Sequence, residues 1–235
     1  DLASADLENL RFRLEDWPFD KILRFYNQAQ VLVSNEPRII KRSEFPEVKT
    51  EIYFDIESDP TEGIDYLLGL LVKKGGKVEY KYFLAKDKED EARIWREFLD
   101  YLESLDDFVI YHYSYYEREV FKRLGNKYGI SIALEDKFKN NTIDLHWKFI
   151  DAAVLPIYFY SLKDVAKYLG FKWEAEDAGG AESVVWYNDW LKTGDQKIMD
   201  KIVKYNEDDV RATLFVKEWL EHQKPRVSRE KLPEE

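Results

Sequence analysis

The stretch Glu51-Ile-Tyr-Phe-Asp-Ile-Glu57 combines strand-forming residues with two closely spaced carboxylates. Successive side chains of a strand point to opposite faces, so Asp55 and Glu57 share one face, roughly 7 Å apart along the strand, and Ile56 points to the other. The two carboxylates repel each other, and the apolar residues around them reduce their solvation. A divalent cation between them relieves both costs. An edge strand with a solvated acidic face is the competing interpretation of this stretch alone.

Further strands are predicted on the C-terminal side of this stretch. Residues 66–73 and 78–84 are apolar or alternating, and Gly75-Gly76 between them is typical of a tight hairpin turn. Two more strands are predicted at residues 108–113 and 142–145. Helices are predicted at residues 87–105, 115–128, 161–170, 179–191 and 197–222. Three antiparallel strands followed by alternating helices and strands indicate a mixed α/β fold.

The first 48 residues have a different pattern. Asp16 is predicted to cap a helix with Pro18 at an early position, and apolar residues at helical spacing continue to Val33. We interpret residues 1–48 as a helical lead-in that packs on the main domain or joins it to an upstream module. Residues 49–222 form the main domain, and residues 223–235 are predicted to be a frayed tail.

Composition restricts the class of protein. The chain has 235 residues, with 36 basic and 47 acidic side chains and a net charge of −11. This charge disfavours binding to nucleic acid by charge alone, but a metal ion or a local basic strip can override it. The absence of cysteine excludes disulfides, zinc ribbons and thiol catalysis. No apolar run approaches the roughly 18 residues of a membrane span, so we expect a cytoplasmic protein with no membrane partner.

Two further acidic patterns accompany the first strand. Tyr205 and Asp209 are four residues apart in the last predicted helix and therefore share a face, whereas Asp208 lies about 100° away. Glu117 follows a strand-to-helix junction, where the helix dipole favours a negative charge even without a ligand. Asp144 ends a short strand and is a competing candidate, although a structural hydrogen bond is its commoner role.

Other residues near Glu117 are candidates for contacts with a substrate. His112 could contact a substrate or an acidic ligand, and a zinc site with His146 is disfavoured because no Cys or nearby third His completes it. Tyr113 could stack on a base, as could its neighbours Tyr111, Tyr115 and Tyr116, with core packing as the alternative. Arg118, Lys122 and Arg123 could hold phosphates, with a solvated helix face as the equal alternative.

The order of these patterns resembles the Tyr-containing branch of the DEDD exonuclease superfamily, which has the RNase H-like fold. The pattern is most similar to the RNase H-like nuclease domain found beside RecB-family nuclease modules, and the resemblance covers about residues 49–222. It rests on the segments Tyr-Phe-Asp55-Ile-Glu57, Val-Ile-Tyr-His112-Tyr-Ser-Tyr-Tyr-Glu117, Thr-Ile-Asp144-Leu, Ser161-Leu-Lys-Asp-Val-Ala-Lys-Tyr-Leu-Gly170 and Tyr205-Asn-Glu-Asp-Asp209. One departure is that Tyr113 and Glu117 stand where that family usually has Asn and Asp.

The resemblance implies a metal-dependent nuclease, with 3′-5′ exonuclease action on DNA or RNA that has a single-stranded end. Two Mg²⁺ or Mn²⁺ ions would be held by Asp55, Glu57, Glu117 and Asp209, with Tyr205 orienting the attacking water. A RecB-like nuclease or helicase domain is the expected partner. An inactive scaffold or nucleic-acid-binding module beside such a nuclease is the rival interpretation, and a hydrolase of small phosphorylated nucleotides would need the same site.

Overall fold

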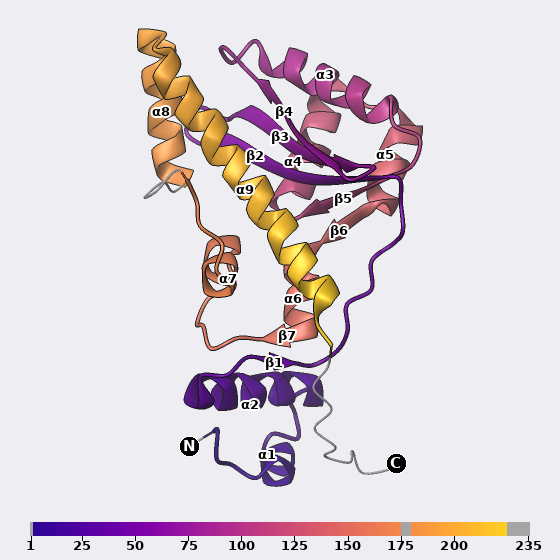
Figure 1. Ribbon diagram of the computed structural model, residues 1–235, viewed down its shortest axis with the longest axis vertical. Helices are drawn as coiled ribbons and strands as arrows, with labels where there is room; N and C mark the ends of the chain where they lie inside the picture. The colour runs from indigo at the N-terminus through magenta and orange to yellow at the C-terminus, as the bar shows by residue number, and fades with distance from the viewer. Residues whose placement is uncertain (1, 175–179, 225–235) are drawn as a thin grey trace.

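The acidic stretch lies in the central strand of a five-stranded mixed sheet (Figure 1). The computed structural model describes residues 2–174 and 180–224. The strands are β2 (Thr50–Asp59), β3 (Ile64–Lys74), β4 (Lys77–Leu84), β5 (Phe108–His112) and β6 (Thr142–Asp144), in the order β4-β3-β2-β5-β6. The first three are antiparallel, and β5 and β6 continue the sheet in parallel. The mixed α/β sheet predicted from the sequence is therefore confirmed, and the edge-strand interpretation of β2 is wrong.

Helices cover both faces of this sheet. The chain contributes α1 (Leu7–Arg13), α2 (Phe19–Ser34), α3 (Glu91–Glu103), α4 (Tyr116–Tyr128), α5 (Ile132–Asn140), α6 (Leu145–Ala152), α7 (Leu162–Leu169), α8 (Gly180–Thr193) and α9 (Gln196–His222). Helices α3, α4 and α5 pack on one face, and α6, α7 and α9 pack on the other. Figure 1 shows the long α9 lying diagonally across the sheet, with α8 beside its first half.

The alternation of β2 assigns its side chains to the two layers. Ile52, Phe54 and Ile56 belong to the core under α3 and α4, whereas Tyr53 belongs to the core under α9. Because Asp55 and Glu57 are two and four residues after Tyr53 in the strand, their side chains lie on the same face and point toward α9. The turn between β3 and β4 has positive φ at both Gly75 and Gly76, which only glycine adopts at low cost, so the predicted hairpin is confirmed.

Several short elements differ from the predictions. Pro18, and not Asp16, occupies the N-cap of α2, and no side chain caps that end. Helices α1, α5 and α6 were not predicted, and Leu145, predicted as the end of a strand, begins α6 because the Asp144 side chain caps that helix. The predicted helix start at Gly179 and the tail from residue 225 lie outside the described residues.

The N-terminal lead-in packs on the main domain. The amide of Gln28 in α2 donates to the carbonyls of Leu155 (2.9 Å) and Ile157 (3.1 Å), and its oxygen accepts from the Tyr160 hydroxyl (2.8 Å). The segment after α2 adds a two-stranded sheet, β1 (Arg38–Ile39) with β7 (Ala153–Val154). A connection to an upstream module stays a prediction. In the described part of the chain, no helix combines the length and apolar character needed to cross a bilayer.

Candidate metal centre

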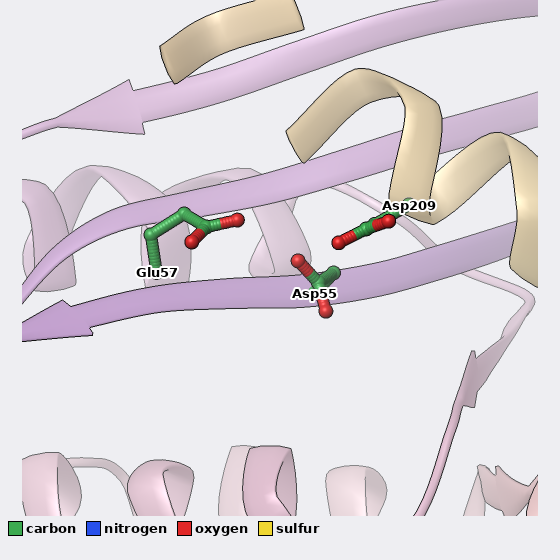
Figure 2. A group of neighbouring side chains, drawn as sticks. All are labelled: Asp55, Glu57 and Asp209. Atoms are coloured by element: carbon green, nitrogen blue, oxygen red, sulfur yellow. The ribbon is translucent and has the colours of Figure 1, made fainter. Parts of the chain in front are cut away.

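Three carboxylates from two elements converge beside the sheet. Asp55 and Glu57 extend from β2, and Asp209 reaches down from α9 toward them (Figure 2). Each residue offers one oxygen, and the three oxygens lie within 4.8 Å of one another. Glu57 is 5% exposed and Asp209 is 8% exposed, while Asp55 is partly buried. The strand's alternation and the crossing of α9 together create this centre.

A glycine in β3 leaves room for a side chain of α9 beside these carboxylates. Gly69 of β3 is the register partner of Asp55 in β2, on the face that α9 covers. A Cβ atom on Gly69 would lie 1.6 Å from the Oδ1 atom of Asn206, which is on α9. Because real Cβ atoms never approach another atom so closely, a side chain at this position would force the Asn206 amide to move from its place beside Asp55.

Burial raises the pKa values of all three carboxyl groups, and repulsion from acidic neighbours adds to it. Burial, followed by repulsion from Asp209, raises the pKa of Glu57 to about 7. Burial raises the pKa of Asp209 to about 6, although the Trp173 ring nitrogen donates to it at 2.6 Å and the Lys163 ammonium attracts it. Burial and the charges of its acidic neighbours raise the pKa of Asp55 well above its usual value. A bound cation would relieve this repulsion.

The donor set fits a hard divalent cation. All the ligand atoms are carboxylate oxygens, which suit Mg²⁺ and Mn²⁺ better than the softer metals that prefer thiolates. Among residues 2–174 and 180–224, this is the one group of three acidic, His or Cys side chains with such spacing. The centre could therefore bind a metal ion.

Glu117 lies near these three carboxylates but is separate from them. It is buried in the first turn of α4, and its negative charge contributes to the raised pKa of Asp55. Its Oε2 atom is 3.4 Å from Nδ1 of the fully buried His112. Neither this oxygen nor either ring nitrogen of His112 has a hydrogen-bond partner within the described ranges. Glu117 is thus directed toward His112.

Asp144 has a structural role in the loops next to Glu117. Its Oδ1 atom accepts hydrogen bonds from the backbone N–H groups of His146 (2.8 Å) and Ser114 (3.0 Å). Ser114 has a positive φ of 78°, which is uncommon for a residue with a side chain, and the bond from Asp144 holds it there. Asp144 is not part of the three-carboxylate group.

Tyr205 lies one helical turn before Asp209 and contacts it. The side chain is buried, and its hydroxyl donates a hydrogen bond to the Asp209 carboxylate. The ammonium of Lys163 lies 4.8 Å from the centre of the Tyr205 ring. Asp208 points elsewhere, as the helix geometry predicts, and accepts from the backbone N–H of Glu174 at 2.8 Å.

A pocket of about 510 Å³ opens beside Asp55 and Asp209. Its other lining residues include Tyr113, Phe159 and Lys163. Tyr113 is held in the wall by a hydrogen bond from its hydroxyl to the backbone carbonyl of residue 160, at 2.9 Å.

The remaining substrate candidates lie apart from this pocket. Arg118 and Lys122 are exposed on α4 and line a second pocket of about 550 Å³, together with Tyr115 and Trp147. Arg123 forms an ion pair with the fully buried Asp65 at 2.8 Å, so it has a structural partner instead of a phosphate. Base stacking by Tyr111 is also excluded, because that ring is fully buried and stacks on Tyr53.

Sequence reasoning missed three residues that act on the carboxylates, Asn206 and Trp173 through hydrogen bonds and Lys163 through its charge. Asn206 lies three residues before Asp209, a spacing that places both on one helix face. The sequence could therefore have indicated that the Asn206 amide lies near the carboxylates. Lys163 and Trp173 come from α7 and from the segment after it, and no local pattern connects them with β2.

Comparison with known proteins gives one match. A family model described as the RNase H superfamily matches residues 52–221, from the beginning of β2 almost to the end of α9. The comparison with curated proteins gave no match, and neither did the comparison with solved structures.

Proposed function

This chain belongs to the RNase H superfamily, and we propose that it is a metal-dependent nuclease that hydrolyses phosphodiester bonds of DNA or RNA. The observation that carries the proposal is the convergence of Asp55, Glu57 and Asp209 on one point beside a pocket. Buried carboxylates without a cation repel each other and would also repel the phosphates of a nucleic acid. The close placement of these three carboxylates in this fold is explained if they hold metal ions that bind a phosphate.

Asp55, Glu57, Glu117 and Asp209 would hold two Mg²⁺ or Mn²⁺ ions. Such ions supply an activated hydroxide at neutral pH and positive charge for the leaving oxygen. To join the other three, Glu117 would have to turn away from His112, toward which it is now directed. His112 acts through Glu117, since a fully buried ring cannot contact the nucleic acid directly.

Tyr205 and the residues around the pocket would position the substrate and the water. The Tyr205 hydroxyl, beside Asp209, orients the attacking water. Tyr113 forms part of the pocket wall, against which a base or sugar can pack. Arg118 and Lys122, four residues apart on an exposed helix face, bind phosphates of the following nucleotides.

We further propose 3′-5′ exonuclease action on a single-stranded end. A volume of about 510 Å³ lies within the range of about 300–1,000 Å³ of small-ligand sites, which suits a terminal nucleotide better than a continuous duplex. The proposal also includes a RecB-like nuclease or helicase as partner, a role in DNA repair and a cytoplasmic location.

The test uses DNA and RNA, single- and double-stranded, labelled at either the 5′ or the 3′ end. With Mn²⁺, the expected result is a ladder of progressively shorter 5′-labelled strands and early release of the 3′ label. Excess chelator and the Asp55→Ala variant should both abolish cleavage. Asp100→Ala, which removes an exposed carboxylate on α3, is the matched control and should cleave normally.

Two results would contradict parts of the proposal. Internal fragments from the start of the reaction would exclude exonuclease action and leave the nuclease assignment standing. Binding of labelled strands with no cleavage under any metal condition would favour the inactive binding module.

A further inference from the structure

The buried amide of Asn206 lies between the two carboxylates of β2. Asn206 has no exposed surface. Its Nδ2 atom donates to Oδ2 of Asp55 at 2.7 Å and lies 3.4 Å from Oε1 of Glu57, at the long end of a hydrogen bond. One amide group therefore contacts two of the three residues of the metal centre.

A second contact fixes the orientation of this amide. The Tyr80 hydroxyl, on β4, donates to Oδ1 of Asn206 at 2.9 Å. The opposite amide orientation would direct Oδ1 toward two carboxylates, which is repulsive, and would leave the Tyr80 hydroxyl facing an NH₂ group. With Tyr80 as the donor, both N–H groups remain available for Asp55 and Glu57.

The sheet is built to admit this amide. Gly69 stands between the register positions of Asp55 and Tyr82, and the absence of its side chain creates the space that Asn206 occupies. The Oδ1 atom of Asn206 is the closest atom to the position of the missing Cβ. Three strands thus contribute to the location of one side chain of α9.

We propose that Asn206 is a positioning residue that holds Asp55 and Glu57 in the orientations in which they bind metal. This inference rests on the proposed function only in treating these two residues as metal ligands. A carboxylate has about four lone-pair sites, so each group can accept an N–H from the amide and still bind an ion. The amide hydrogens also offset part of the repulsion between the carboxylates before an ion binds.

The experiment measures Mn²⁺ affinity of the metal-free protein, from the loss of the free-ion signal in electron paramagnetic resonance. Removing a partner that orients metal ligands typically lowers affinity about 10- to 100-fold. We expect Asn206→Leu, which keeps the branched shape of the side chain but has no polar group, to bind Mn²⁺ weaker by that factor. Tyr80→Phe, which loses only the hydroxyl, should weaken binding by a smaller factor and provides the test if Asn206→Leu does not fold.

Asn188→Leu is the matched control. Its amide also donates to a carboxylate, Oδ2 of Asp59 at 2.9 Å, but Asp59 is not one of the three carboxylates of the metal centre, so Mn²⁺ affinity should stay at the wild-type value. Wild-type affinity in Asn206→Leu, or in Tyr80→Phe if that variant alone folds, would overturn the inference.

The outcomes separate this inference from the proposed function. If the wild-type chain binds Mn²⁺ but cleaves no nucleic acid, the nuclease assignment fails while the affinity of the variants still tests Asn206. If the wild-type chain binds no Mn²⁺, the metal centre and the role of Asn206 are both rejected.

Discussion

Individual residues of the centre are in an unfavourable electrostatic state without a cation. Glu57 and Asp209 are almost fully buried, and Asp55 faces both of them. The chain offers partial compensation through the Trp173 ring nitrogen, the Asn206 amide and the Lys163 ammonium. These contacts lower the pKa values of the carboxyl groups only in part, because burial remains the largest influence on each of them.

Removing one carboxylate should therefore stabilise the metal-free fold while abolishing function. We expect Asp55→Ala to leave the melting temperature in chelator unchanged or raised, because repulsion with Glu57 and Asp209 is relieved. Stabilisation by Mn²⁺ should disappear in the same variant. Thermal melts with and without Mn²⁺, beside those of Asp100→Ala, check this; a lower melting temperature with Mn²⁺ stabilisation retained would contradict it.

Substitutions of Tyr205 and Asp209 are expected to have different effects, the first on catalysis and the second on metal binding. Tyr205→Phe keeps the ring against its neighbours but loses the hydroxyl that would orient the water, so kcat should fall roughly 10- to 10³-fold with Mn²⁺ affinity nearly unchanged. Asp209→Asn should weaken Mn²⁺ binding directly, because it removes the charge of a ligand.

The control for the Tyr205 prediction is Tyr168→Phe, which removes an exposed hydroxyl on α7. Steady-state kinetics and Mn²⁺ titrations on all three variants provide the measurement. Normal turnover in Tyr205→Phe would reduce Tyr205 to a packing residue.

At the scale of elements, the centre depends on the contact between β2, β3 and α9. The strand supplies two carboxylates on one face, and the helix supplies Tyr205, Asn206 and Asp209 within little more than one turn. Gly69 leaves the space in the sheet that the Asn206 side chain of α9 fills. A small change in β3 should therefore affect ligands on two other elements.

Gly69→Ala tests this contact. The added methyl group must displace Asn206, and overpacking of this kind typically costs about 1–3 kcal/mol of unfolding free energy. Mn²⁺ affinity should decrease in the same variant, because the amide that orients Asp55 moves. Denaturant unfolding and Mn²⁺ titration measure the two effects.

Gly180→Ala is the control, because a Cβ atom on Gly180 would have no neighbour within 4 Å. It should leave both the unfolding free energy and the Mn²⁺ affinity close to the wild-type values. An equally small effect of Gly69→Ala would show that the Asn206 side chain can move without cost.

The whole molecule combines a net charge of −11 with a buried acidic centre. Both features oppose the binding of a polyanion, and an ion at the centre reverses the sign of the charge only locally. Nucleic acid affinity is therefore expected to depend strongly on the divalent ion. The stability of the fold should depend on that ion and on pH together.

Without metal, the contribution of Glu57 and Asp209 to stability should fall as pH rises from about 4 to about 7. The ordinary pKa values are 4.5 for Glu and 3.8 for Asp, whereas the folded protein raises them to about 7 for Glu57 and about 6 for Asp209. The native state then binds more protons than the unfolded state within this window. The stability present at low pH is thus lost as the groups ionise, by on the order of 3 kcal/mol for each group.

Saturating Mn²⁺ should reverse this slope, because the metal binds the ionised carboxylates. Melting temperatures from pH 4 to pH 8, with chelator and with Mn²⁺, provide the comparison, and Asp100→Ala should behave as the wild type does. Parallel pH profiles in the two conditions would contradict the assignment of the raised pKa values to the metal centre.

The sequence by itself determined the succession of the main strands along the chain and that Asp55 and Glu57 share one face of their strand. Period-two alternation in β2 and the four-residue spacing in α9 are local properties, set by backbone geometry, and they fix the relative directions of Asp55 and Glu57 and of Tyr205 and Asp209. The short helices α5 and α6 were not predicted from the sequence. Each has only a few apolar residues, and these indicate a buried helix face only once they are seen packed in the cores beside the sheet.

Only the tertiary structure decided which distant residues complete the centre. The contact of Asn206 with Tyr80 and Gly69, and the bond from Trp173 to Asp209, join segments far apart in the chain. Contact of His112 with an acidic ligand was one of two alternatives from the sequence, and only the structure shows that Glu117 is directed toward it, since a helix N-terminus stabilises an acid in any rotamer. Such contacts depend on how α9 crosses the sheet and on the space that Gly69 leaves for Asn206, and no local sequence period encodes either.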